Sequence, residues 1–176
     1  MRVTPQVSRF FGSGLLLILI LPCFPAISGA QAVPEVKLTV ATANPRAVEP
    51  LTEHSIVRDY AAAWQELARA SENNAVSLLD SYFAGNAKAM LTTAISGQIK
   101  TGTHTRYSNQ VHNLKVTFYA PEGDVMELQD SAEYQMQIIS EGKVIHDEHV
   151  VVQNLVLMTP AADRWVIRQL QAMPGS

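Results

Sequence analysis

Apolar residues recur at three- and four-residue steps between residues 52 and 67, which is the spacing of one face of an α-helix. Thr52 is a favourable N-cap residue, and the apolar face that follows it consists of Ile56, Val57, Tyr60, Trp64 and Leu67. A shorter helical pattern starts at Asn74 and is expected to end at Gly85 in a left-handed cap, and a third starts at Asn86 and ends at Gly102. The first half of the chain therefore predicts three helices.

After Gly102 the period of the pattern changes from three or four residues to two. Apolar residues alternate with polar ones over residues 112–119, where Leu114, Val116 and Phe118 share one face with His112, and over residues 126–138. A third strand is predicted over residues 144–158 and a last one over residues 164–170. Turn residues at 121–124 and 141–143 separate the first three runs. Four strands after three helices predict an α+β fold in which the helices pack on one face of a mainly antiparallel four-stranded sheet.

The first 32 residues have the three parts of a secretory signal peptide. Arg2 and Arg9 form a basic start, residues 14–21 are almost all leucine and isoleucine, and Ala30 and Ala32 offer small residues to a signal peptidase. We expect cleavage and export to the periplasm or the medium. The alternative is an uncleaved segment, residues 10–30, that anchors the chain in the inner membrane of a bacterium.

Residues 33–51 contain three prolines around an alternating stretch at residues 36–40. This segment is either a linker or an edge strand, and the folded domain is expected to span residues 52–174. The only cysteine, Cys23, lies within the signal, so the mature domain would have neither a disulfide nor a thiol nucleophile. Without Arg2 and Arg9 the chain keeps 11 basic and 16 acidic residues, a net charge of −5, which argues against nucleic acid as a partner.

Three stretches of the sequence, "RDYAAAWQELARASENN", "LLDSYFAGNAKAMLTTAI" and a terminal "DRWVIRQL", resemble the NTF2-like (SnoaL-like, cystatin-like cone) superfamily over residues 52–173. The resemblance implies a curved sheet wrapped around the long helix to form a cone, which is either open to a small ligand or filled with side chains. Enzymes of this superfamily use a carboxylate or histidine in the cone, together with a tyrosine or a second acid that polarises a carbonyl.

Asp130 is the best candidate for such a carboxylate, because alternation places it on the apolar face between Leu128 and Ala132. Desolvation there would suit it to proton transfer. A tyrosine is needed beside it, and Tyr60 and Tyr134 are the first candidates, with Tyr82 and Tyr107 as further ones. The structural alternatives are a bulge that moves Asp130 to the surface, or an ion pair with Arg106 or Arg168.

Four other residues are candidates for ligand binding: Trp64, His104, Tyr107 and His112. The two histidines flank a polar segment that we expect to be a loop at the cone mouth, and ordinary loop polarity explains them equally well. Trp64 and Trp165, at helical and strand core positions, are expected to serve packing rather than a binding platform. His146 and His149 suggest a metal, but residues three apart on a strand point to opposite faces. The sequence predicts no metal site and no cofactor.

Together these observations favour an exported, non-catalytic binding or assembly module of the bacterial envelope, with an unidentified protein or small molecule as partner. The polar sheet face could pair two copies; it bears Gln129, Glu133, Gln135 and Gln137. Two alternatives stay open. One is a small-molecule isomerase, dehydratase or hydrolase that uses Asp130 and a tyrosine, and the other is a membrane-anchored scaffold component of a secretion or envelope-transport machine.

Overall fold

Five strands form a single mixed sheet in the computed structural model, which describes residues 32–174. The strands follow one another in the sheet in chain order: β1 (Glu35–Thr39), β2 (Thr103–Tyr119), β3 (Met126–Ser140), β4 (Lys143–Ala161) and β5 (Arg164–Ala172). β1 runs parallel to β2, and the other three pairs are antiparallel. Short turns join the antiparallel strands, as expected for hairpins.

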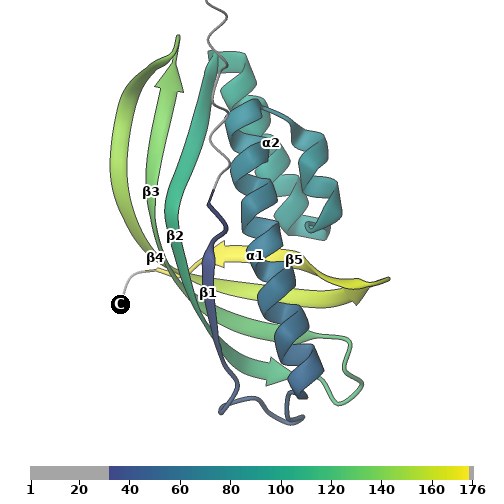
Figure 1. Ribbon diagram of the computed structural model, residues 1–176. Coiled ribbons are helices and arrows are strands. Elements are labelled where there is room, and N and C mark those ends of the chain that lie inside the picture. The colour runs from purple at the N-terminus through teal and green to yellow at the C-terminus, as the bar shows by residue number, and fades with distance from the viewer. Residues whose placement is uncertain (1–31, 175–176) are drawn as a thin grey trace, which may run out of the picture.

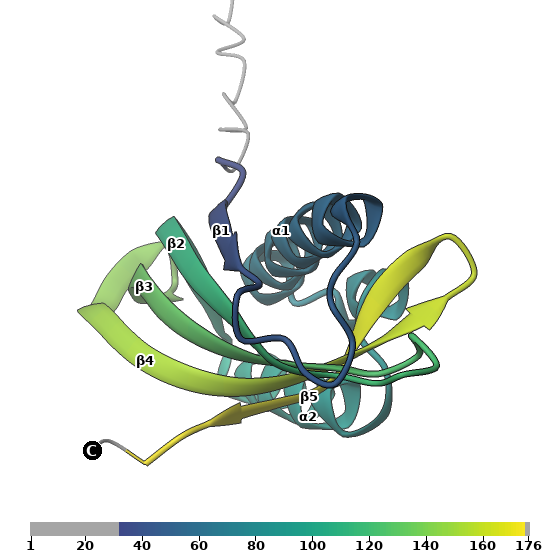
Figure 2. The ribbon, with the colours of Figure 1, turned by 90° about the horizontal axis from the view of Figure 1, so that it is seen from below.

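Three helices follow β1 along the chain and precede β2. They are α1 (Pro50–Asn73), the six-residue 3-10 helix η1 (Val76–Ser81) and α2 (Gly85–Thr101). α1 packs against β1, β2 and β5, and α2 packs against β2 and β5. Figures 1 and 2 show that β2, β3 and β4 are long and strongly curved, and that α1 crosses the hollow side of the curve.

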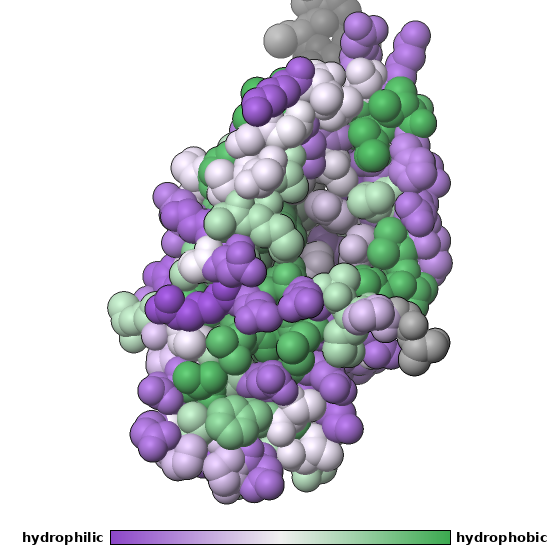
Figure 3. Space-filling view, turned by 180° about the vertical axis from the view of Figure 1, so that it is seen from behind, coloured by the Kyte–Doolittle hydropathy of each residue, from purple (hydrophilic) through white to green (hydrophobic). Residues whose placement is uncertain are grey.

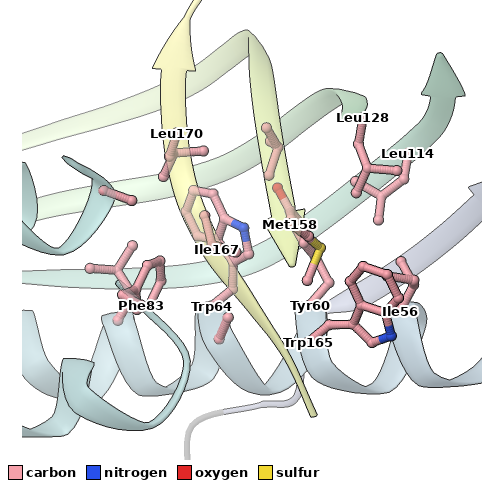
Figure 4. Packing of buried hydrophobic residues seen from close by; sticks show 14 of the residues in the cluster. Ile56, Tyr60, Trp64, Phe83, Leu114, Leu128, Met158, Trp165, Ile167 and Leu170 are labelled. Carbon is pink, nitrogen blue, oxygen red and sulfur yellow. The ribbon is translucent and has the colours of Figure 1, made fainter. Parts of the chain in front are cut away.

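The core lies between α1 and the curved sheet (Figure 4). The buried face of α1 repeats at three- and four-residue steps, and its largest side chains are Ile56, Tyr60, Trp64 and Leu67. Figure 4 shows the Tyr60 and Trp64 side chains extending from α1 toward the strands. This helix therefore buries four of the five residues of the predicted face, whereas Val57 is only half-buried.

The predicted fold is wrong in the number of strands and in the second helix. Residues 35–39 form a fifth strand, whose pairing with β2 makes the sheet mixed, and Val36 and Leu38 pack against the core. The predicted second helix is shortened to η1 because β5 binds the chain that follows it. The N–H of Ala84 donates to the Ile167 carbonyl (2.9 Å), and the N–H of Ile167 donates to the Tyr82 carbonyl (2.8 Å).

Several predicted boundaries also differ. α1 begins at Pro50 after Glu49 rather than at Thr52, since proline fits the first turn of a helix. Gly85 opens α2 instead of closing the preceding helix, whereas the predicted end of α2 at Gly102, in a left-handed conformation, is confirmed. The predicted loop before His112 is part of β2, which is continuous from Thr103.

No helix within residues 32–174 is long and apolar enough to cross a membrane. The predicted signal peptide, and the alternative anchor at residues 10–30, lie outside the described residues.

Candidate functional site

Asp130 lies in the core, on the face of β3 that is turned toward α1. It is 0% exposed, its neighbours on that face are Leu128 and Ala132, and it lies opposite Leu114 of β2 and Asn154 of β4. The bulge and ion-pair alternatives are therefore both wrong. Arg106 pairs with Glu72 and Arg168 donates to Thr159, so neither of these arginines reaches Asp130.

Three side chains surround the Asp130 carboxylate. The Tyr60 hydroxyl donates to Oδ2 at 2.8 Å, and the Asn154 amide donates to the same oxygen at 3.3 Å. His112 Nδ1 lies 3.0 Å from Oδ2 and 3.2 Å from Oδ1. We call these four residues the Asp130 cluster. It joins α1, β2, β3 and β4.

The cluster explains how a carboxylate is tolerated in an apolar core. An unpaired buried charge would cost many kcal/mol, whereas charge-assisted hydrogen bonds from several donors offset most of that cost. Burial raises the pKa of the Tyr60 hydroxyl well above its usual value of 10, and the negative charge of Asp130 adds to this shift. Tyr60 therefore stays protonated and keeps donating to Asp130.

His112 has one satisfied and one unsatisfied ring nitrogen. An ionised Asp130 can only accept, so Nδ1 carries the proton that it donates, and a neutral imidazole then has Nε2 as an acceptor. Nε2 is buried and has no hydrogen-bond partner among the described residues, and the same holds for the indole Nε1 of Trp64. The two rings lie against each other with centroids 4.4 Å apart and their planes tilted by 39°.

A row of aromatic rings leads away from His112. Trp64 lies 5.8 Å from Tyr134, and Tyr134 lies 5.5 Å from Tyr107 in an edge-to-face arrangement. Burial raises the pKa of Tyr107 to about 12 and also raises the pKa of Tyr134. Both tyrosines are only partly buried, so the row connects the sealed Asp130 cluster to the surface.

Of the residues that the sequence nominates for catalysis, Asp130 and Tyr60 meet directly, and Tyr134 lies one ring further out. Of those nominated for ligand binding, Trp64 and His112 contact each other and Tyr107 ends the aromatic row. His104 is not part of the site; it lies at the start of β2 opposite Ile139.

Tyr82 is also elsewhere, under the guanidinium of Arg164. Asn154 is the member of the Asp130 cluster that sequence reasoning missed. Its signal was present, because Asn154 takes an inward position in the same alternation as Val156 and Met158.

The histidines of β4 lie beside surface carboxylates. His146 pairs with Glu148 at 3.1 Å on the same strand, and His149 pairs with Glu133 of β3 at 3.3 Å. Within residues 32–174 no group of three or more histidine, cysteine, aspartate or glutamate side chains is placed to hold a metal ion.

The chemistry open to the Asp130 cluster is limited by its burial. Asp130, His112 and Tyr60 are each 0% exposed, and every short contact of the carboxylate is to another member of the cluster. Proton transfer to a substrate would require the side chains that cover His112 to move aside. Holding α1 against β2, β3 and β4 requires no such movement. The arrangement favours a structural role.

Comparison with known proteins gives one informative result. No family model and no curated protein matches the chain. Among solved structures, the fold is similar to the intermembrane space region of the chloroplast protein ARC6, with a TM-score of 0.57 and 12% sequence identity over 74% of this chain and 100% of that one. At this identity the similarity shows a shared fold alone, and the resemblance to the NTF2-like superfamily stays a prediction.

Proposed function

We propose that this protein is an exported, non-catalytic assembly module of the bacterial envelope that binds a protein partner. The sealed Asp130 cluster supports the non-catalytic part of the proposal. The envelope location rests on the predicted signal at residues 1–32 and is compatible with the structural similarity to a domain from an intermembrane space.

The observation that carries the proposal is an unpaired strand edge on β4. β5 pairs with β4 only from Asn154 onward, so the side of residues 143–152 that faces away from β3 has no neighbouring strand among the described residues. We call residues 143–152 the free β4 edge. Three apolar side chains on it are exposed: Val144 (48%), Ile145 (62%) and Val151 (73%).

Unpaired backbone N–H and C=O groups beside exposed apolar side chains form a template for another strand. In Figure 3 apolar groups interrupt the hydrophilic residues along the flank that carries the β3–β4 hairpin. Residues 143–149 are exposed on both faces of the strand, so this part of the hairpin extends beyond the core and is accessible from both sides.

The proposal is tested by photocrosslinking in the intact envelope. Val151→benzoyl-phenylalanine, in the full chain, should give a discrete adduct with a protein that mass spectrometry identifies. The same group at the exposed helical position Thr93 is the control and should not give that adduct. The Val151 adduct should also disappear when Ile145→Lys is added. Equal adducts from both positions, or none from Val151, would contradict binding at the free β4 edge.

A second candidate, a proton-transfer enzyme, is favoured by one observation. The carboxylate of Asp130 holds Nδ1 of His112, which leaves Nε2 free in the manner of a general base. If the aromatic row admits a small molecule, added phenol should shift the ¹⁵N resonance of His112 Nε2, whereas toluene, which lacks the hydroxyl, should not. An unchanged Nε2 resonance at saturating phenol would exclude this candidate for phenolic ligands.

A further inference from the structure

We infer that the free β4 edge binds an extended strand of another protein, antiparallel to residues 146–152, and that this strand has a β-branched half and a basic half. The inference rests on the proposed function, because it names the chemistry of the partner that the edge would bind. Antiparallel pairing is slightly more stable per residue than parallel pairing, and it matches the pairing of β4 with β3 and with β5.

The position open to this strand continues the line of β5. β5 runs beside only part of β4 (Figure 1), and beyond β5 the N–H of Met173 donates to the Gln153 carbonyl at 2.7 Å. In the other direction the regular register of β4 ends at Ile145, which is the extra residue of a bulge. An incoming strand can therefore pair with residues 146–152 before it meets the end of β5.

Residues 146–152 consist of a charged half and an apolar half. The apolar half is the β-branched run Val150–Val152, in which Val151 is 73% exposed and the other two residues are half-buried. The charged half contains Asp147 and Glu148, and both side chains are exposed. Pairs of apolar β-branched residues and pairs of opposite charge stabilise neighbouring strands. A complementary strand therefore has β-branched residues in one half and cations in the other.

The two acidic residues require cations at adjacent positions of the partner. Neighbouring residues of a strand point to opposite faces of the sheet, so Asp147 and Glu148 each need a cation on their own face. The side-chain amides of Gln135 and Gln137 donate to Asp147, and these hydrogen bonds lower the pKa of its carboxyl. Asp147 is therefore ionised at neutral pH, and its neutral amide donors do not cancel its charge.

The surroundings of the edge are also negative. Glu141 lies in the turn before β4, and Glu133 of β3 lies opposite Val151. With histidines counted as neutral, Lys143 is the only basic residue between residues 127 and 152. An incoming cation is therefore attracted and an incoming carboxylate repelled. A second copy of this chain would set one negative edge against another, so the charge favours a different protein as the partner.

The inference is tested with a fluorescent, acetylated and amidated peptide of the order Val-Ile-Val-Thr-Lys-Lys-Thr. Its first three residues would lie opposite Val152, Val151 and Val150, and its lysines opposite Glu148 and Asp147. The same peptide with glutamates in place of the lysines should bind the purified full chain about tenfold more weakly by fluorescence anisotropy. A peptide of the same composition in reverse order sets lysines against valines and should also bind more weakly.

Charge reversal on the protein should reverse the preference between the two peptides. The full chain with Asp147→Lys and Glu148→Lys should bind the glutamate peptide more tightly than the lysine peptide, which also shows that its edge is still folded. The matched control carries Glu122→Lys and Asp124→Lys, which change the net charge equally in the turn between β2 and β3. This control should keep the preference for the lysine peptide.

The outcomes separate this inference from the proposed function. The lysine peptide should cross-link to the chain with Val151→benzoyl-phenylalanine and not to the chain with that group at Thr93. Equal binding of the two peptides, or a reversed preference in the Glu122 and Asp124 control, would overturn the inference. A Val151 adduct to another protein would then leave the proposed function standing. An adduct between two copies of the chain would replace this partner with self-pairing, and no specific Val151 adduct at all would overturn both.

Discussion

Replacing Tyr60 with phenylalanine tests whether the Asp130 cluster stabilises the fold. The substitution keeps the buried ring and removes only the hydroxyl that donates to Asp130 at 2.8 Å. A hydrogen bond to a charged group contributes about 1.5–3 kcal/mol. Tyr60 is 0% exposed, so its hydroxyl has no contact with solvent that would take over from the lost hydrogen bond. We expect the free energy of unfolding to fall by about 2 kcal/mol.

The corresponding shift in melting temperature follows from the size of the domain. Residues 32–174 imply an unfolding entropy of about 300 cal/mol/K near the midpoint, so about 2 kcal/mol lowers Tm by roughly 7 °C. Circular dichroism at 222 nm during heating and in urea measures both quantities.

The matched control is Tyr134→Phe, which removes a hydroxyl one ring away from the cluster. It should change the free energy of unfolding by less than about 0.5 kcal/mol, as is usual away from a buried network. If Tyr60→Phe also lowers stability by less than that amount, the Asp130 cluster does not stabilise the fold and the argument for its structural role fails.

Three further predictions follow from other parts of the fold. Asp59→Ala should lower the unfolding free energy by about 2–3 kcal/mol in urea titrations, because the buried carboxylate accepts from the backbone N–H of Trp165 at 2.7 Å and that donor would lose its partner; an effect below about 0.5 kcal/mol would contradict this. Gly123→Ala should cost more than Gly142→Ala by calorimetry, since both glycines have positive φ but only at Gly123 would a Cβ lie 2.6 Å from a guanidinium nitrogen; equal costs would show that the guanidinium moves away freely. The pKa of Tyr107 is raised in the folded protein to about 12 from the usual value of 10, so its contribution to the free energy of unfolding is complete below pH 10 and is lost as the pH rises to 12. In urea titrations at stepped pH, Tyr107→Phe should remove up to about 2.7 kcal/mol of the resulting decline in unfolding free energy. The same dependence of unfolding free energy on pH in the native chain and the variant would refute this.

The pattern of apolar and polar residues predicted those helices and strands that bury a single face against the core. The helical period gave the buried face of α1, and alternation gave the inward positions of β2 up to Val116. It failed at Phe118, which is 40% exposed, because the register of β2 and β3 shifts between Val116 and Phe118. A bulge of this kind depends on the partner strand and leaves no mark in a period of two.

Long-range pairing explains the remaining errors. β1 is a strand because β2, more than seventy residues later, offers an unpaired edge to residues 35–39. Alternation alone could not separate that strand from a linker rich in proline. His112 was expected at the end of a loop because the preceding residues are polar, but a left-handed Asn109 and a register shift after Ser108 allow β2 to continue through them.

The Asp130 cluster also limits how α1 can lie on the sheet. Apolar side chains alone oppose a shift of the helix by one turn only through their shapes, because apolar contacts are not directional. A buried carboxylate does not tolerate it, because moving Tyr60 by one turn would remove a donor from Asp130 and leave the hydroxyl without its partner. His112 and Asn154 extend the same requirement to β2 and β4. On this reasoning, a variant in which apolar residues replace all four members of the Asp130 cluster (Tyr60→Phe, His112→Leu, Asp130→Leu and Asn154→Leu) leaves no donor of the cluster unpaired, and it should keep the stability of the native chain while packing α1 in more than one position. Broadened methyl resonances from the α1–sheet interface would reveal that loss of uniqueness, and a single sharp set would show that apolar packing alone fixes the helix.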